Sequence, residues 1–273
     1  MTWRLLAAPG AAPAIGPVLA AVHGLADNAG TWQALAARLR PAGYRCYAAD
    51  APWRGDAGRS PADWTTSSTG PAEWLGSALT ELPEPADVLV GHSFGANVVL
   101  DHLAAHPQPP VRAAVLLAPL VRPSGRAPRP DLLARTRAAI GQVVADGLRA
   151  RLGERAGRVG DDVVAAMARK ALRQIPDGAA DVVLDRLLAT PRPTLARIAT
   201  PTLVLAGHDD QRLAGVRPDS LAVMPAAQVR VHAHYGHFCH ITQAAEVAAE
   251  CAGFLDHVVP AAAPAGPTME VPV

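Results

Sequence analysis

The sequence lacks any unbroken run of about 20 apolar residues, so we expect no membrane-spanning helix. It has only three cysteines, which show no C-x-x-C spacing and form no even set for a disulfide framework, so a reducing cytoplasm is the expected location. A strong charge of either sign is also missing, because a net charge of +1 creates no global field for nucleic acid or a membrane surface. Lysine is almost absent. Lys170 is the only one, and with the many Ala, Gly and Pro residues this bias is typical of a GC-rich bacterial genome.

The apolar stretch 5–22 follows Arg4 and resembles a secretory signal peptide. Five residues interrupt it, however, and would break a continuous helix: Pro9, Gly10, Pro13, Gly16 and Pro17. The stretch also runs directly into His23-Gly24. We therefore predict two short strands joined by a turn.

Residues 88–96 read Val-Leu-Val-Gly-His-Ser-Phe-Gly-Ala, a G-x-S-x-G pattern between a predicted strand and a predicted helix. A serine hydroxyl is a poor nucleophile and must project from a tight strand-to-helix turn to reach both a base and a substrate carbonyl. At Ser93 the backbone N–H groups of the helix N-terminus can face a developing oxyanion. The alternative is a strand–turn–helix with an incidental serine.

Strand-like and helix-like segments alternate through most of the 273 residues. The predicted strands are 3–7, 18–22, 45–49, 87–90, 111–117, 202–206 and 228–232. The predicted helices are 32–39, 71–82, 96–105, 131–152, 161–175, 179–188 and 242–257. This alternation predicts an α/β protein with a mostly parallel central sheet and helices on both faces.

The alternation stops between about residues 120 and 198, where only helices are predicted. We therefore expect a first core part over 1–119, a helical cap insertion over 120–198, a second core part over 199–258 and a disordered Pro/Ala-rich tail over 259–273. Within the insertion, an apolar stripe at 3-to-4 spacing is expected to form part of a pocket roof. Its members are Leu133, Ile140, Val144 and Leu148.

Polar residues follow several of the predicted strands, and the carboxyl ends of parallel strands meet at one edge of a sheet. Ser93 follows strand 87–90, Asp209 and Asp210 follow strand 202–206, and His237 follows strand 228–232. The chain order is therefore Ser, Asp, His, and the sheet is expected to bring these residues together.

Five motifs together resemble the α/β-hydrolase fold family, of the serine esterase or thioesterase type, over residues 3–258. They are HG at 23–24, D-x-P…G…G-x-S at 50–60, GHSFGA at 91–96, PTLVLAGHDD at 201–210 and GHF at 236–238. The resemblance implies that Ser93 is the nucleophile, His237 its base and Asp210 the acid that orients His237. It also implies an oxyanion hole from the backbone N–H groups of Leu25 and Phe94.

Several assignments have competitors. His240 is the alternative base, His232 is expected to pack at its strand end, and Asp209 competes with Asp210, which stands three residues after Gly207. The four histidines 232, 234, 237 and 240 lie near Cys239, but their spacings form no regular zinc motif, so neither a metal nor another cofactor is expected.

We expect four residues to border the substrate: His23, Gly24, Trp53 and His92. His23 and Gly24 would shape the oxyanion loop without transferring a proton. Loop packing is the alternative for Trp53, as it is for Arg54, Trp64 and Trp74. The longer loop after Asp50 departs from the family pattern.

The insertion is unusually basic, with 15 Arg and Lys against 8 Asp and Glu between residues 120 and 197. A solvated helical face is one interpretation, and a surface for an anionic acyl carrier protein or coenzyme A thioester is the other.

The leading functional prediction is hydrolysis of a small carboxylic ester or thioester through an acyl-enzyme. The same triad also supports acyl transfer, lactonisation or cyclisation, and C–C bond cleavage. A non-catalytic ligand-binding protein is the alternative from another class. Fold-level resemblance selects none of these substrates.

Overall fold

The computed structural model describes residues 3–6, 16–54, 70–106, 109–121, 130–175, 192–208 and 218–259, and the structural statements below concern these residues. Their strands form one seven-stranded sheet in the order β1-β3-β2-β4-β5-β6-β7. The strands are β1 (Trp3–Leu5), β2 (Val18–Val22), β3 (Arg45–Ala49), β4 (Val88–His92), β5 (Ala113–Leu117), β6 (Thr202–Gly207) and β7 (Ala227–His232). Only β1 is antiparallel to its neighbour, so the predicted α/β class with a mostly parallel sheet is confirmed.

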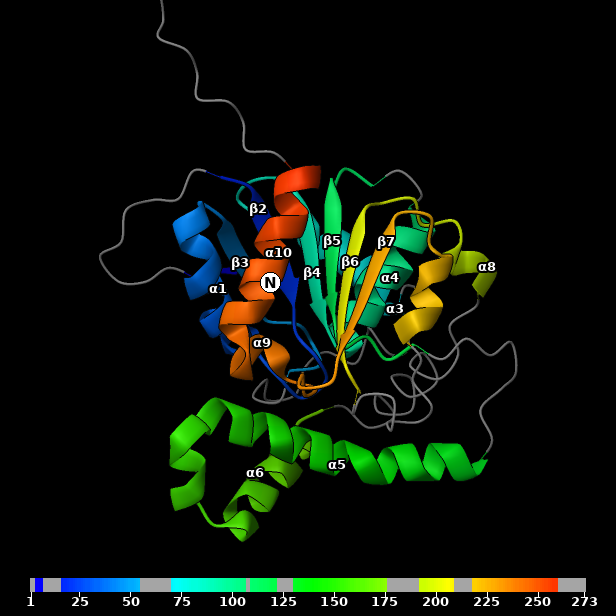
Figure 1. The fold of residues 1–273 in the computed structure, drawn as a ribbon. Helices are drawn as coiled ribbons and strands as arrows, with labels where there is room; N and C mark the ends of the chain where they lie inside the picture. Colours follow the sequence, from blue (N-terminus) through cyan, green and yellow to red (C-terminus); the bar gives the residue numbers. More distant parts are fainter. Residues whose placement is uncertain are drawn as a thin grey trace, which may run out of the picture.

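Helices cover both faces of this sheet (Figure 1). One face carries α1 (Gln33–Leu39) and α10 (Ala244–Val258), and the other carries α3 (Gly70–Leu79), α4 (Phe94–Ala105) and the short α8 (Arg192–Leu195). Strand β2 shows why its sequence is apolar without alternation. Leu19 and Ala21 pack toward α1 and α10, whereas Ala20 and Val22 pack toward α3 and α4. A strand buried on both sides needs an apolar residue at every position.

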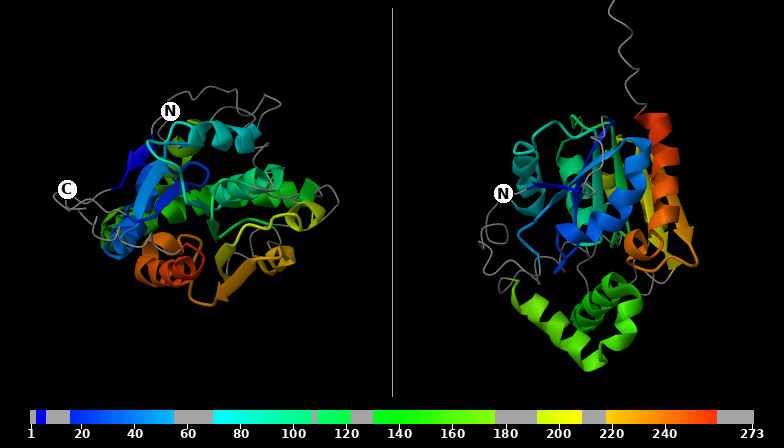
Figure 2. Two further views of the ribbon diagram at one scale, coloured as in Figure 1. Left: turned by 90° about the horizontal axis from the view of Figure 1, so that it is seen from above. Right: turned by 90° about the vertical axis from the view of Figure 1, so that its left-hand side faces the viewer.

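Two longer helices, α5 (Pro130–Leu152) and α6 (Asp161–Arg173), lie together beyond one end of the sheet, as Figures 1 and 2 show. They are joined by the 3-10 segment η3 (Gly153–Arg158) and share a small apolar core of their own. That core contains Ala145, Val164 and Ala168, with Val144, Leu148, Leu152 and Val159 packed around it. Val144 and Leu148, which the sequence placed on the predicted pocket stripe, therefore pack against α6.

Most predicted elements agree with the observed ones to within a few residues, and two 3-10 segments, η1 (Ala29–Trp32) and η2 (Arg40–Ala42), flank α1. The predicted helix 242–257 corresponds to α10. A short helix that was not predicted, α9 (Cys239–Thr242), precedes it, and Gln243 separates the two with a non-helical backbone at φ −117° and ψ 34°. A further 3-10 segment, η5 (Pro218–Val223), precedes β7. The predicted helix 179–188 and the tail 259–273 lie outside the described residues, apart from Val259. Among the described helices, none is both long and apolar enough to span a bilayer.

Candidate active site

Ser93 occupies the tight turn between β4 and α4 that the sequence predicted. Its backbone lies at φ 52° and ψ −121°, a conformation that L-residues with a side chain rarely adopt. The Ser93 N–H donates a 2.9 Å hydrogen bond to the carbonyl of Leu117 at the end of β5, which helps to hold the turn. Strain of this kind persists only where the surroundings fix it, and it is typical of functional turns.

Gly91 and Gly95 flank this turn, where neighbouring backbone atoms leave no room for a side chain. A Cβ on Gly95 would lie 2.2 Å from the Val22 carbonyl oxygen, and one on Gly91 would lie 2.5 Å from the Ala96 Cα. Neither neighbour is a flexible side-chain end, so the turn requires glycine at both positions. The G-x-S-x-G pattern is thus explained by close packing of α4 against β2 and β4.

His237 stands beside Ser93, with its Nε2 atom 3.0 Å from the Ser93 Oγ atom. This separation is within the range for a hydrogen bond between a nucleophile and its base. His92 holds the loop that carries His237, because its Nε2 donates a 2.9 Å hydrogen bond to the His237 carbonyl. His92 is 1% exposed, and its predicted place beside the substrate stays a prediction. Asp209 and Asp210 lie outside the described residues, and the acidic member of the triad stays a prediction.

The turn after β2 carries the predicted oxyanion donor Leu25. Ala26 has a positive φ of 57°, and its N–H donates to the Trp53 carbonyl at 3.0 Å. A Cβ on Gly24 would meet the Ser93 Cβ at 3.2 Å, so this turn approaches the nucleophile closely. Phe94 is the first residue of α4, where a backbone N–H has no acceptor within the helix. The roles of Leu25 and Phe94 in an oxyanion hole stay predictions.

His23 supports this turn from inside the core. It is fully buried, its Nδ1 lies 2.8 Å from the Gly24 carbonyl, and its Nε2 accepts the Ala51 N–H at 3.1 Å. Burial lowers the His23 pKa to about 4, so the ring is neutral at neutral pH. The expectation that His23 borders the substrate stays a prediction.

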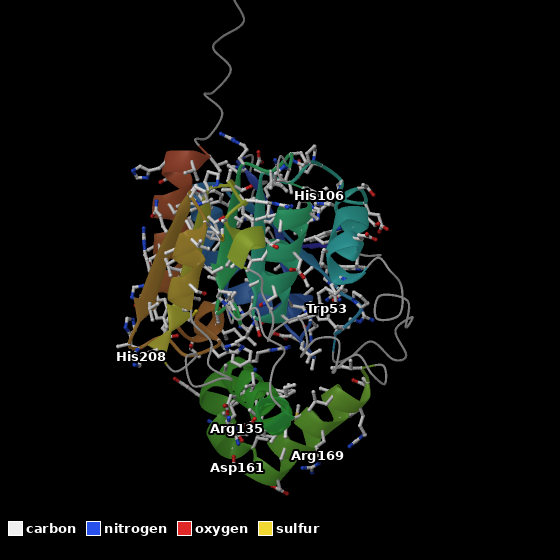
Figure 3. The ribbon with its side chains drawn as sticks, turned by 90° about the vertical axis from the view of Figure 1, so that its right-hand side faces the viewer. Trp53, His106, Arg135, Asp161, Arg169 and His208 are labelled. Carbon is white, nitrogen blue, oxygen red and sulfur yellow. The ribbon has the colours of Figure 1, made fainter. Side chains whose placement is uncertain are left out.

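Trp53 also supports the turn from inside the core, at the end of the sheet that faces the insertion (Figure 3). Its side chain is 0% exposed and its indole N–H donates to the His23 carbonyl at 3.0 Å. Its ring packs edge-on against Trp74 and Phe94, with ring centroids 4.7 Å and 5.0 Å away. The structure thus favours the packing alternative over a place on the substrate path.

A cleft of about 470 Å³ lies beside His237, between α5 and the segment from Gly236 to Thr242. Its lining residues are Ala139, Gln142, Val143, Asp146, Arg149 and Ala150 of α5, with Gly236, His237, Phe238 and Thr242. Gly147 lets α5 rest on Phe238, because a Cβ there would lie 2.6 Å from the Phe238 ring. The α5 face that meets this cleft is therefore different from the stripe predicted from apolar spacing.

Two residues that the sequence did not single out connect the surroundings of the site. Arg151 of α5 forms an ion pair with the buried Asp27, two residues after Leu25. Asn97 of α4 bonds both backbone groups of Leu120, accepting from its N–H at 3.1 Å and donating to its carbonyl at 2.9 Å. No local sequence pattern at Asp27 or Asn97 indicates such distant partners.

Acid is expected to destabilise the fold through its buried neutral histidines. Burial lowers the pKa of His92 well below 6.5, that of His240 to about 3 and that of His23 to about 4. The unfolded chain therefore binds more protons than the native one below pH 6.5. Each histidine then costs up to about 1.4 kcal/mol of unfolding free energy per pH unit as the pH falls from 6.5 toward 4.

Urea unfolding at pH 7, 6 and 5 measures this effect. The exposed His257→Gln variant should keep the pH dependence of the parent chain, whereas His240→Asn should reduce its slope. An equal free energy of unfolding at pH 7 and pH 5 would show that these imidazoles are not held neutral.

Comparisons with known proteins agree with the fold. The sequence matches the alpha/beta hydrolase family over residues 19–250. An esterase from Rhodococcus sp. ECU1013 is 21% identical with a TM-score of 0.66, covering 94% of each chain. A bromoperoxidase from Bacillus anthracis is 18% identical with a TM-score of 0.67, covering 89% of this chain and 92% of the other.

The thioesterase domain from the curacin biosynthetic pathway is 18% identical with a TM-score of 0.59, covering 92% of this chain and 98% of that domain. Identities this low demonstrate a shared fold and leave the substrate open. Curated protein sequences give no match. The family match spans most of the chain, and the sheet order and the serine turn agree with it: the chain belongs to the alpha/beta hydrolase family.

Proposed function

We propose that the protein is a serine hydrolase that cleaves a carboxylic ester or thioester through an acyl-enzyme on Ser93. The observation that carries this proposal is the 3.0 Å separation between Ser93 Oγ and His237 Nε2 at a strained strand-to-helix turn. Family membership supports a hydrolase, and the similar structures include an esterase and a thioesterase domain.

In the first half-reaction, Ser93 Oγ attacks the substrate carbonyl carbon while His237 Nε2 takes the hydroxyl proton. The carbonyl oxygen becomes an oxyanion, and the N–H groups of Leu25 and Phe94 are the proposed donors to it. Each such donor is worth about 3 kcal/mol of transition-state stabilisation. His237 then gives its proton to the leaving alcohol or thiol, and the acyl group stays on Ser93.

In the second half-reaction, His237 takes a proton from water, and the resulting hydroxide attacks the acyl carbon. Collapse of the second tetrahedral intermediate releases the carboxylic acid, and the proton returns to Ser93 Oγ. Asp210 is the proposed acid that holds the tautomer of His237 and stabilises its protonated form.

The helices α5 and α6 are proposed to act as the cap that the sequence analysis placed over 120–198. Support comes from their position beyond the sheet and from the cleft that α5 forms beside His237. Val143 and the methyl groups of Ala139 and Ala150 offer apolar contact to an acyl chain there. Burial of each methylene contributes about 0.8 kcal/mol.

Turnover of p-nitrophenyl esters with acyl chains of increasing length tests the proposal, with the matching thioesters run in parallel. We expect a burst of p-nitrophenol equal to the enzyme concentration whenever deacylation is slow. Absence of turnover across oxygen esters and thioesters alike would favour the non-catalytic alternative.

We expect the salt dependence of turnover to reveal the substrate's charge. Arg155, Arg158 and Arg169 are exposed on the insertion, and Arg135 and Arg169 are visible there in Figure 3. Attraction between exposed charges is screened within about 8 Å at physiological salt. For a coenzyme A or carrier-protein thioester, kcat/KM should therefore fall steeply with salt, while a neutral short ester should respond little.

A charge-removal variant, Arg155→Ser with Arg158→Ser, should flatten the salt dependence seen with the anionic thioester. The matched control Arg38→Ser, on the exposed side of α1, should leave it unchanged. Equal salt dependence for anionic and neutral substrates would mean that the basic insertion is only a solvated surface.

A further inference from the structure

Buried polar atoms without a hydrogen-bonding partner gather at one place in the described part of the chain. They are Asp27 Oδ2, Trp32 Nε1, His92 Nδ1 and His240 Nδ1. The fifth such atom among the described residues, Trp74 Nε1, lies elsewhere. Asp27, His92 and His240 are 6%, 1% and 0% exposed, and one potential ligand atom from each lies within 4.8 Å of the others. We call Asp27, Trp32, His92 and His240 the buried polar centre.

Four different segments supply this centre, with Trp32 coming from η1. Asp27 comes from the turn after β2, His92 from the end of β4, and His240 from α9 just after the His237 loop. Trp32 packs on both imidazoles, with ring centroids 5.0 Å from His240 and 6.5 Å from His92. Buried polar groups are almost always hydrogen-bonded, so four neighbouring exceptions indicate one common partner.

The hydrogen bonds around the centre determine which of its atoms donate and which accept, and so which donors and acceptors the common partner must have. His92 Nε2 faces the His237 carbonyl, which only accepts, so the proton is on Nε2 and His92 Nδ1 carries a lone pair. Burial lowers the pKa of both His92 and His240, which keeps the rings neutral. His240 Nε2 lies 2.9 Å from the Thr31 hydroxyl, which can donate to it and leave the proton on Nδ1.

One carboxylate and two imidazoles form a donor set that zinc accepts. The charges around the centre favour a neutral ligand instead, because the Arg151 guanidinium already pairs with the other oxygen of Asp27. Trp32 adds an N–H, which donates only and repels a cation. A water molecule matches the set, since it can donate to Asp27 and His92 and accept from His240.

We propose that Asp27, His92 and His240 hold one buried water molecule that positions the His237 loop relative to the oxyanion turn. The chain of contacts runs from Arg151 of α5 through Asp27 and the water to His92, and from there to the His237 carbonyl. Asp27 and His240 are then positioning residues, which act on the reaction only through their neighbours. This catalytic consequence rests on the proposed function, whereas the water site itself does not.

A crystal structure at better than about 1.5 Å resolution tests the site, with diffraction data collected on both sides of the zinc absorption edge. We expect one peak about 2.7–3.2 Å from Asp27 Oδ2, His92 Nδ1 and His240 Nδ1, without anomalous signal. An anomalous peak with bonds of about 2.0–2.2 Å would show that the site holds a metal ion instead of water and would overturn the proposal. Direct hydrogen bonds among the three side chains would also overturn the proposal. None of these results depends on the role of Ser93.

Two variants of His240 test the positioning role, with kcat expressed per active site titrated by a fluorophosphonate. His240→Leu removes the polar contact, and we expect kcat to fall about 10- to 100-fold at unchanged KM, because small displacements of catalytic groups cost this much. His240→Asn keeps a polar atom near the Nδ1 position and should restore kcat to within about threefold.

Thr31→Ser is the matched control, because it keeps the hydroxyl that bonds His240 Nε2 and removes only a methyl group. Its kcat should stay within about threefold of the parent value. A kcat per titrated site that is unchanged in His240→Leu would overturn the positioning role, even if the melting temperature falls. If His240→Leu does not fold, the crystal structure of the parent protein decides.

Discussion

Replacing Ser93 by alanine is expected to lower kcat for an activated ester by about 10⁵- to 10⁶-fold, the scale of losing the nucleophile of a serine triad. The physical reason is that the Ser93 Oγ atom, 3.0 Å from His237 Nε2, is the proposed nucleophile, and alanine has no hydroxyl to take its place. Initial rates with a p-nitrophenyl ester and gel labelling with a fluorophosphonate measure the loss. Ser77→Ala on α3 is the matched control and should retain the parent rate.

The same position gives a stability readout that does not depend on activity. Because Ser93 has a φ of 52°, alanine keeps the backbone strain, whereas glycine adopts this region without it. Ser93→Gly should therefore be more stable to unfolding than Ser93→Ala by about 1 kcal/mol, with both variants inactive. An Ala variant that still hydrolyses the ester or binds the fluorophosphonate would remove the turn from the mechanism.

Asp210→Asn is expected to lower kcat by about 10⁴-fold, since an amide in place of the triad acid favours the wrong tautomer of the histidine. Asp209→Asn is the matched variant, at the preceding position in the sequence, and should lose less than about tenfold. Steady-state kinetics on both variants, with folding checked by circular dichroism, separates the two residues.

If kcat falls more in Asp209→Asn than in Asp210→Asn, the triad acid is Asp209 instead of Asp210. Near-parent rates in both variants would mean that neither carboxylate orients His237. These outcomes concern only the acid, because the contact between Ser93 and His237 is independent of it.

The fold was predictable because its central strands, β2 to β6, are short and buried. Strands β2 and β3 were predicted at their observed limits, since Val18–Val22 is wholly apolar and Arg45–Ala49 is flanked by Gly43 and Asp50. The short helix α9 was missed because its four residues, Cys239–Thr242, are too few to show a helical period. Local pattern therefore located the elements better than their ends.

The proximity of Ser93 and His237 was predictable because both follow parallel strands, whose carboxyl ends meet at one edge. The burial of Trp53 and His23 was not predictable. The sequence around an aromatic residue near a site does not distinguish a side chain that faces the substrate from one that faces the core. The pairing of Asp27 with Arg151 spans 124 residues, and no local pattern encodes so distant a contact.

The most direct measurement of the central claim is the mass of the protein quenched with acid during turnover of a slowly deacylating ester. We predict that the intact chain gains one acyl group and that peptide mapping places it on Ser93. Ser93→Ala treated identically should gain none. An acyl group mapped to another residue, or turnover with no covalent adduct under burst conditions, would contradict the acyl-enzyme mechanism.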